Sequence, residues 1–301
     1  MRTTTDDWHP HFIVIGAVKA ATTWIQKQLQ RHDNVFLPDP EPHFFSQDFH
    51  KGPEFYRTFF ADRSPGETVV GEKSADYFAH PAAADRIASM MPKVRLILQL
   101  RDPVARAYSD YKMLYRRGTV HGPPEEYLRS LHNSQPRFLV DGLYGRHLTR
   151  WLSRFPRESI LTFLYEDISS DPRTTVERVS AHIGVSPQFD DATAGRKENN
   201  SAEKLLPLRM RLALAPLKGV VSPLRDNALF DAARSLLARE VAYPPLSRDL
   251  EQHLRSFYLP DIEILEKLIG RDLTAWKQAG PEAATTGAFA THLGNSNTSK
   301  V

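Results

Sequence analysis

Residues 11–29, HFIVIGAVKAATTWIQKQL, constrain the fold more than any other stretch of this chain. The stretch begins with an apolar run that predicts a buried strand and ends with apolar residues at helical spacing. Unpaired backbone N–H groups and the positive end of the helix dipole meet in a loop of this kind. Lys19 adds a positive charge, and Thr22 and Thr23 add hydroxyl donors. The stretch therefore predicts a loop that binds a phosphate group.

Strand-like runs alternate with helical patterns over the first 185 residues. The expected strands are Phe12–Ile15, Thr68–Val70, Val94–Leu100 and Ile160–Tyr165. The expected helices are Thr23–Gln30, Pro81–Met90, Pro103–Arg116, Leu143–Arg154 and Pro172–Ile183. This order predicts an α/β fold with a central, mostly parallel sheet flanked by helices.

The C-terminal part has a different pattern. Residues 203–268 are helical in character but interrupted by prolines, and the last helix is expected at Asp261–Ile269, with Gly270 as its stop. Residues 279–301 are rich in Gly, Ala, Thr, Ser and Asn, which predicts a disordered tail. We therefore expect a single domain over residues 1–278.

Composition narrows the class of protein. The 301 residues carry a net charge of +3, which suits an anionic ligand but is too weak to predict nucleic-acid binding. The chain has no cysteine, which excludes disulfides, thiolate metal sites and cysteine nucleophiles. Since no signal-like or membrane-spanning apolar segment is evident, we expect a soluble cytoplasmic protein. Residues 205–224 are read as a core helix pair or, alternatively, as a substrate lid or a basic helix that touches a membrane.

The spacing within the loop argues against two common nucleotide motifs. A nucleoside-triphosphate loop places a glycine directly before its lysine, whereas here Lys19 follows Gly16 by three positions without such a glycine. The glycine pattern of dinucleotide-binding folds is also missing. The structural alternative is a plain strand-to-helix turn with one exposed lysine.

A second block, LRDPVARAYSDYKM at residues 100–113, follows the most apolar expected strand. Ligands of open α/β sheets bind at the carboxyl ends of the strands, where this block begins. The guanidinium of Arg101 and the hydroxyl of Ser109 are suited to hold one phosphate together. The alternative is a local Arg101–Asp102 ion pair with Ser109 on the helix surface.

Taken in this order, the two blocks resemble the 3′-phosphoadenosine-5′-phosphosulfate (PAPS) binding segments of sulfotransferases. Further similarity to the glycosaminoglycan (heparan sulfate)-type and bacterial carbohydrate enzymes lies in EPHFFS at residues 41–46, GEKSADYF at 71–78 and GLYGRHLTRWLSRFP at 142–156. The resemblance implies a sulfotransferase domain with a loop like a phosphate-binding loop. It implies transfer of a sulfuryl group from PAPS to a hydroxyl of a carbohydrate or another small molecule.

The resemblance also implies roles for particular residues. The 5′-phosphosulfate would be held by Lys19, Thr22 and Thr23 of the loop, and the 3′-phosphate by Arg101 and Ser109. The complete implied nucleotide site comprises Lys19, Ala20, Ala21, Thr22, Thr23, Trp24, Arg101, Ser109, Tyr144, Arg196 and Lys197.

Sulfuryl transfer needs a cation at the leaving oxygen and a base at the attacking hydroxyl. Lys19 and Lys73 are the candidate cations, so no metal is expected, although Lys73 is alternatively a surface lysine at a strand end. The resemblance implies that Glu41 is the base, and His43 is the rival because cytosolic sulfotransferases use a histidine.

The chain departs from the family pattern at two positions. Ala21 replaces a loop glycine, which puts tight cofactor binding in question, and Ala75 replaces a proline. Two other functions stay open from sequence: a small-molecule kinase, or a nucleotide-binding protein without catalytic activity.

Overall fold

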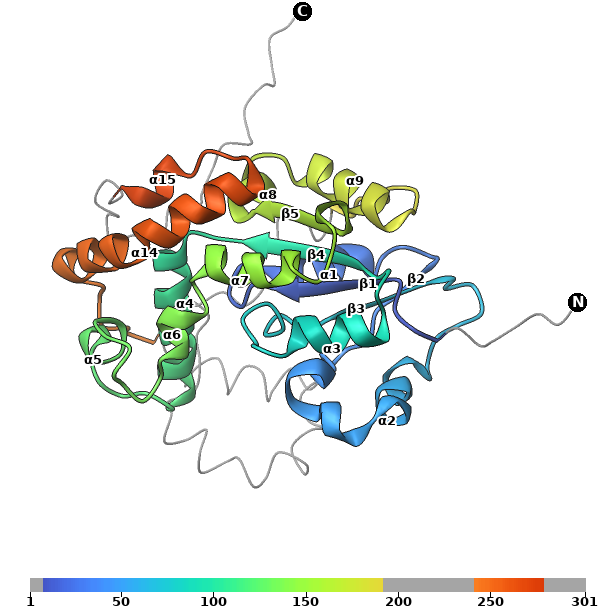
Figure 1. The fold of residues 1–301 in the computed structure, drawn as a ribbon, viewed down its shortest axis with the longest axis horizontal. Helices are drawn as coiled ribbons and strands as arrows, with labels where there is room; N and C mark the ends of the chain where they lie inside the picture. The colour runs from blue at the N-terminus through green and yellow to red at the C-terminus, as the bar shows by residue number, and fades with distance from the viewer. Residues whose placement is uncertain (1–7, 192–240, 279–301) are drawn as a thin grey trace, which may run out of the picture.

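A computed structural model describes residues 8–191 and 241–278 of the chain (Figure 1). The strands are β1 (Phe12–Gly16), β2 (Val35–Phe36), β3 (Val69–Lys73), β4 (Arg95–Leu100) and β5 (Ile160–Leu164). The α-helices are α1 (Thr22–Leu29), α2 (Pro53–Arg57), α3 (Ala83–Met90), α4 (Pro103–Arg117), α5 (Pro124–Leu128), α6 (Arg137–Val140), α7 (Tyr144–Leu152), α8 (Tyr165–Ser170), α9 (Pro172–Ile183), α14 (Arg248–Ile269) and α15 (Thr274–Lys277). Short π or 3₁₀ turns are η1 (Phe44–Asp48), η2 (Phe49–Lys51), η3 (Thr58–Phe60) and η4 (Arg157–Ser159).

The five strands form one sheet in the order β2-β3-β1-β4-β5, and every pairing is parallel. The predicted central parallel sheet is therefore confirmed. Because all strands run the same way, the loops that follow β1, β3, β4 and β5 leave from the same edge of the sheet. This edge gathers the loop after β1, the segment after Lys73 and the start of α4 (Figure 1).

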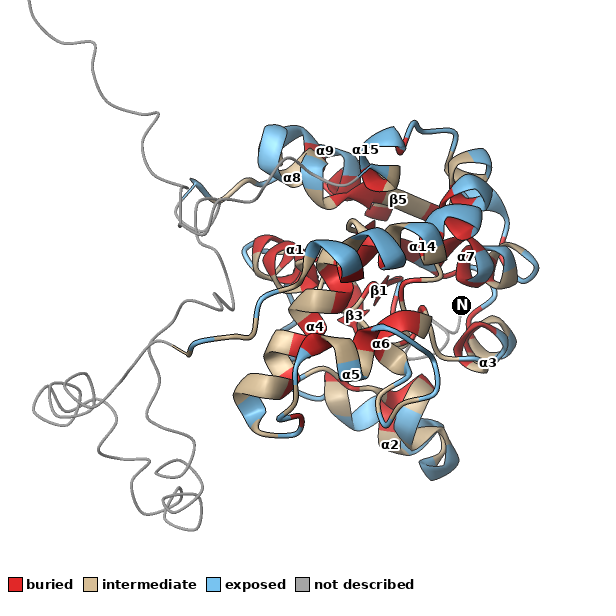
Figure 2. Cartoon of the chain, turned by 90° about the vertical axis from the view of Figure 1, so that its left-hand side faces the viewer, coloured by how far each residue is buried: buried red, intermediate tan, exposed pale blue. Residues whose placement is uncertain are grey.

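Helices cover both faces of the sheet, and alternate strand residues face each layer. Ile13 of β1 and Leu98 of β4 pack with α3, α4, α7 and α14 on one face. Val14 and Ile97 pack with α1 and α9 on the other face. In Figure 2 the buried residues accordingly form a band through the strands and the inner sides of the helices. This burial on both faces explains why the expected strands are almost continuously apolar.

Most expected elements are present, with shifted ends. The strand expected at Thr68–Val70 extends to Lys73, and the helix expected from Pro81 begins at Ala83. The sequence analysis missed β2 and the short helices α2, α5, α6, α8 and α15. Elements of two to six residues carry too few positions for a period to be recognised.

The last long helix corrects an expectation. It begins at Arg248 rather than Asp261, with the Ser247 hydroxyl accepting a hydrogen bond from the Leu250 N–H, and it ends at Gly270 as expected. Asp261 lies within this helix, and its carboxylate accepts hydrogen bonds from the backbone N–H groups of Gly145 and Arg146, both at 2.8 Å. The C-terminal helix thus supplies the cap that the first turn of α7 lacks in its own sequence.

Several predictions fall outside the described residues. They are the roles of Arg196 and Lys197, the two readings of residues 205–224, and the tail at residues 279–301. Among the residues that are described, no helix is long and apolar enough to cross a membrane.

Candidate functional site

The loop after β1 presents several backbone N–H groups without acceptors. Lys19 and Ala21 both adopt left-handed backbone conformations, with φ of 66° and 67°. The N–H of Ala20 bonds within the loop, to the Ala17 carbonyl oxygen at 3.1 Å. Within residues 8–191 and 241–278, no acceptor is found for the N–H groups of Lys19, Ala21, Thr22 and Thr23. Unpaired amides at the first turn of a helix are the requirement of an anion site.

Gln99 of β4 supports this loop through two hydrogen bonds, and the sequence analysis did not identify it. Its carbonyl oxygen accepts from the Ala17 N–H at 2.6 Å, and its side-chain amide donates to the carbonyl of Ala20. Gln99 is fully buried. Gln99 inside the apolar run VRLILQL was the available signal, because a polar side chain in a buried strand needs a hydrogen-bond partner.

Lys19 is a cation without a carboxylate partner among the residues described. Its ammonium nitrogen lies 3.8 Å from the sulfur of Met113 on α4. Burial lowers the pKa of Lys19, and the positive charges of Arg117, Arg101 and Arg116 lower it further, against the opposing effect of Asp110. A partly buried ammonium in a positive field is stabilised when an anion binds beside it.

Arg101 joins the two predicted halves of the site. Its guanidinium donates to the Lys19 carbonyl oxygen at 3.4 Å and lies over the ring of Tyr165, with Cζ 4.8 Å from the ring centroid. Ser109 is half-buried on α4, one turn before Met113, and so lies on the helix face that meets Lys19. Tyr165 was missed, although its place directly after β5 was a usable signal.

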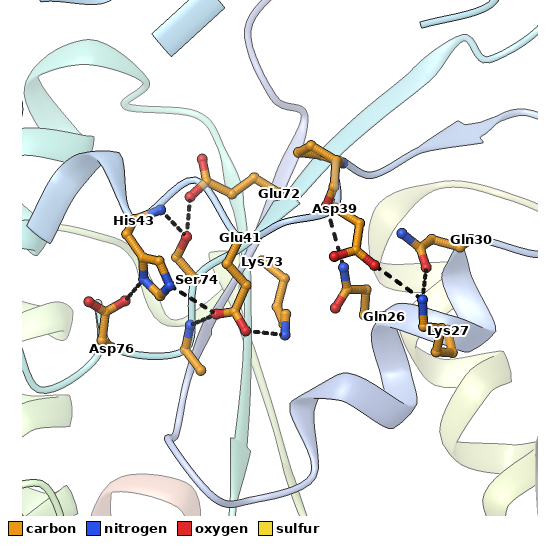
Figure 3. A network of polar contacts seen from close by, with 12 residues as sticks. Gln26, Lys27, Gln30, Asp39, Glu41, His43, Glu72, Lys73, Ser74 and Asp76 are labelled. Atoms are coloured by element: carbon orange, nitrogen blue, oxygen red, sulfur yellow. Dashed lines mark hydrogen bonds and ion pairs between the residues drawn. The ribbon is translucent and has the colours of Figure 1, made fainter. Parts of the chain in front are cut away.

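Glu41 and Lys73 form an ion pair at the carboxyl end of β3 (Figure 3). The Lys73 ammonium lies 2.5 Å from Oε1 of Glu41, and the backbone N–H of Ala75 donates to Oε2 at 3.1 Å. The Lys73 side chain is only 3% exposed. The alternative reading of Lys73 as a surface lysine is therefore wrong.

His43 lies beside this pair and is held from two directions. Its backbone N–H donates to the Ser74 hydroxyl at 2.9 Å, and its Nδ1 lies 2.7 Å from Oδ1 of Asp76 (Figure 3). His43 has a left-handed backbone, with φ of 51°, a strained conformation of the kind that gathers at functional sites. Asp76 was not among the predicted site residues.

Glu72, behind Ser74, is a fully buried acid. Its carboxylate accepts hydrogen bonds from the hydroxyls of Tyr56 and Ser74, the latter at 2.9 Å. Burial raises the pKa of Glu72 to about 7, and hydrogen bonds from Tyr56, Tyr77 and Ser74 oppose this rise. Glu72 therefore titrates near neutral pH while it is connected through Ser74 to the backbone of His43.

The raised pKa of Glu72 predicts a pH dependence of stability. The unfolded chain releases this proton near the ordinary value of 4.5, whereas the folded chain keeps it until about pH 7. The folded state binds more protons in this window, so the free energy of unfolding falls as the pH rises through it. Between pH 5 and 8 the loss attributable to Glu72 is about 2–3 kcal/mol.

Glutamine at position 72 carries no titrating proton, so Glu72→Gln is expected to lose less stability than wild type between pH 5 and 8. Urea unfolding at the two pH values measures this difference, and Glu177→Gln, at an exposed position on α9, is the control. An unchanged pH slope in Glu72→Gln would contradict the buried titration.

Two predicted nucleotide contacts are not supported by the geometry. Tyr144 has no exposed surface and packs between Phe78 and Trp276, with centroid distances of 6.1 and 6.2 Å. Trp24 is 5% exposed and lies on the core side of α1. Both rings fill the apolar layers, and a contact of either residue with the nucleotide stays a prediction.

The described residues contain no group of three or more His, Asp or Glu side chains arranged to hold a metal ion.

Comparison with known proteins decides the family. The profile of the sulfotransferase domain matches residues 9–205, about two thirds of the chain. The chain belongs to the sulfotransferase family.

Individual relatives agree with this assignment. This sulfotransferase-family chain is 30% identical over 302 residues to bifunctional heparan sulfate N-deacetylase/N-sulfotransferase 4 of Mus musculus, covering 91% of the chain and 32% of the relative. It is 29% identical over 272 residues to heparan sulfate glucosamine 3-O-sulfotransferase 3B1 of Mus musculus, covering 87% of the chain and 64% of the relative. The chain thus spans about a third of the first protein and less than two thirds of the second.

A solved structure shares the fold of the described residues. The crystal structure of a sulfotransferase from Alicyclobacillus acidocaldarius superimposes with a TM-score of 0.66 at 24% identity, covering 90% of this chain and 99% of that chain. This likeness shows that the α/β sheet and its helical layers are the sulfotransferase fold.

Ala21 is where this family member departs from the expected glycine, and its backbone is in the left-handed region, at φ 67° and ψ 30°. That conformation costs a residue with a Cβ about 1–2 kcal/mol. Ala21→Gly is therefore expected to raise the free energy of unfolding by about 1 kcal/mol, part of the gain being lost to the greater freedom of glycine in the unfolded chain. Chemical denaturation measures the change.

The matched control is Ala20→Gly, one residue earlier. Ala20 is fully buried and its φ is not positive, so this variant is expected to be less stable than wild type. If Ala21→Gly brings no gain, the loop accommodates the alanine without strain.

Proposed function

We propose that this protein transfers a sulfuryl group from PAPS to a hydroxyl group of a saccharide or another small molecule. The observation that carries the proposal is the loop after β1. Unpaired amides, the first turn of α1 and the ammonium of Lys19, which has no carboxylate partner among the described residues, converge there. Glu41 and Lys73 line the same edge of the sheet and supply acid–base and cationic groups.

The geometry supports a division of the nucleotide site between two segments. Lys19, Thr22 and Thr23 are suited to bind the 5′-phosphosulfate through amides, hydroxyls and one ammonium. Arg101, which contacts the carbonyl of Lys19, is suited to bind the 3′-phosphate with Ser109. Both roles are consistent with the positive field that lowers the pKa of the Lys19 amine.

The proposed reaction is an in-line displacement at sulfur. The acceptor oxygen forms a bond to sulfur while its proton passes to a base in the Glu41–His43 pair. The bond between sulfur and the bridging phosphate oxygen breaks, and that oxygen keeps the electron pair. Lys19 and Lys73 neutralise the negative charge that develops there. The products are a sulfate ester and adenosine 3′,5′-bisphosphate.

The acceptor class is proposed from the relatives. Both relatives described above are named for heparan sulfate, and one of them for its glucosamine unit. We therefore place a saccharide hydroxyl first among acceptors.

Two measurements test the function. Titration calorimetry with adenosine 3′,5′-bisphosphate is expected to show binding, and incubation with PAPS carrying labelled sulfate is expected to label a saccharide acceptor. A protein that does not bind the bisphosphate contradicts the proposal, as does turnover of magnesium–ATP in its place. Binding without transfer across a broad acceptor panel would instead indicate a non-catalytic nucleotide-binding protein.

A further inference from the structure

Four titratable side chains form a row, in the order Asp76, His43, Glu41, Lys73 (Figure 3). The imidazole lies between the two acids, with Nδ1 2.7 Å from Asp76 and Nε2 3.9 Å from Oε2 of Glu41. Glu41 lies between the imidazole of His43 and the ammonium of Lys73. Acidic and basic groups thus alternate along the row.

Asp76 determines how the imidazole is presented. Its carboxylate can only accept at Nδ1, so Nδ1 carries a hydrogen and Nε2 is left on the side of Glu41. The Ser74 hydroxyl accepts a hydrogen bond from the His43 backbone N–H and so fixes the main chain at this residue. The ring itself is held by Asp76.

The charges that face His43 favour its protonated form. The hydrogen bond to Asp76 is the largest influence that raises the pKa of His43, the charges of Asp76, Glu41 and Glu72 add to it, and burial opposes it. Burial also opposes the ionisation of Asp76, but the hydrogen bond from His43 lowers the pKa of that carboxyl below its ordinary value. Lys73, at the other end of the row, is itself paired with Glu41.

We propose that Asp76 holds His43 as an imidazolium, so that Nε2–H donates a hydrogen bond to the transferring sulfuryl group and Glu41 alone accepts the acceptor proton. This inference rests on the proposed function. An imidazolium with hydrogens on both nitrogens has no lone pair to accept a proton, which leaves the carboxylate of Glu41 to accept it. Two titratable groups in different surroundings can divide the acid and base roles between them in this way. Asp76 acts through His43 and is a positioning residue.

The pH profile of kcat distinguishes this role from that of a histidine base. An imidazolium donor is lost as the pH rises through the pKa of His43, so activity is expected to fall on the alkaline side. Asp76→Asn removes the carboxylate that stabilises the imidazolium and is expected to move this fall to lower pH. If the fall moves by one pH unit, kcat of the variant is about tenfold lower than that of wild type at pH values above the fall. At pH values below the fall, the two kcat values differ little.

Controls separate positioning from folding. Asp39→Asn removes a different carboxylate, which lies two residues before Glu41 and pairs with Lys27 at 3.2 Å without touching His43. This variant is expected to leave the pH profile of kcat unchanged. Asp76→Glu restores a carboxylate and is expected to restore part of the alkaline activity. The proposal would be overturned if Asp76→Asn lowered kcat equally at every pH, or if it moved the acidic side of the pH profile instead of the alkaline side.

A direct titration tests the protonation state without any turnover. The chain has 12 histidines, and the His43 proton resonance is assigned by its absence in His43→Gln. We expect it to titrate above 6.5 in wild type and at lower pH in Asp76→Asn. An ordinary value in wild type overturns the inference. Failure of bisphosphate binding, with the titration as expected, overturns the sulfotransferase proposal instead.

Discussion

Replacing Glu41 by glutamine is expected to lower kcat for sulfuryl transfer by about 10²–10⁴-fold, the range that general-base groups contribute. The amide cannot take the hydroxyl proton, yet its oxygen can still accept a hydrogen bond from Lys73, which is 2.5 Å from the carboxylate in the present structure. Binding of adenosine 3′,5′-bisphosphate is therefore expected to change little. Steady-state sulfate transfer and calorimetry on the same preparation measure the two effects.

The control for Glu41→Gln is again Glu177→Gln, at an exposed position on α9. Thermal unfolding of each variant shows whether the loss of the ion pair with Lys73 has disturbed the fold. A kcat within about threefold of wild type would contradict the assignment of Glu41 as base, since it is far below the range expected for a lost base.

Removing the ammonium of Lys19 is the second large effect. Lys19→Met is expected to lower kcat by about 10²–10³-fold, the loss measured when one preorganised donor to a developing negative charge is deleted. Bisphosphate binding is expected to weaken as well, because the ammonium is a charge-assisted donor. The unliganded variant is expected to be at least as stable as wild type, because burial and three arginines lower the pKa of Lys19 and so disfavour its charged form.

Lys27→Met provides the matched control for Lys19→Met. Lys27 is on α1 in the same part of the chain, but its partner is Asp39 and its side chain is 39% exposed. Its loss is expected to leave transfer and binding unchanged. A variant of Lys19 that binds and transfers normally would show that the ammonium is not needed for either step, whereas one that unfolds would show that it is structural.

The elements that carry the site were predictable because their signals are local. The apolar run of β1, the loop with Lys19 and the apolar spacing of α1 are contiguous in sequence, and the proline at the start of α4 marks a helix that the structure contains. Arg101 was found because it directly follows an apolar strand. The sulfotransferase resemblance rested on the same short segments.

The pairings inside the site were not predictable, because each joins residues that only the sheet brings together. Glu41 meets Lys73 across 32 positions and His43 meets Asp76 across 33, while Gln99 reaches Ala20 across 79. The burial of Tyr144 was not predictable for a related reason, since it depends on packing against Trp276 from the C-terminal segment.

By itself, the sequence determined an alternating α/β fold, an anion-binding loop at a helix N-terminus and the carboxylate and lysine candidates for chemistry. Periodicity and loop composition record these features, because they depend on neighbours in the chain. Only the tertiary structure decided that Lys73 is buried against Glu41, that Asp76 orients His43 and that Gln99 supports the loop. The order β2-β3-β1-β4-β5 sets which strand ends adjoin, and no local pattern encodes that order.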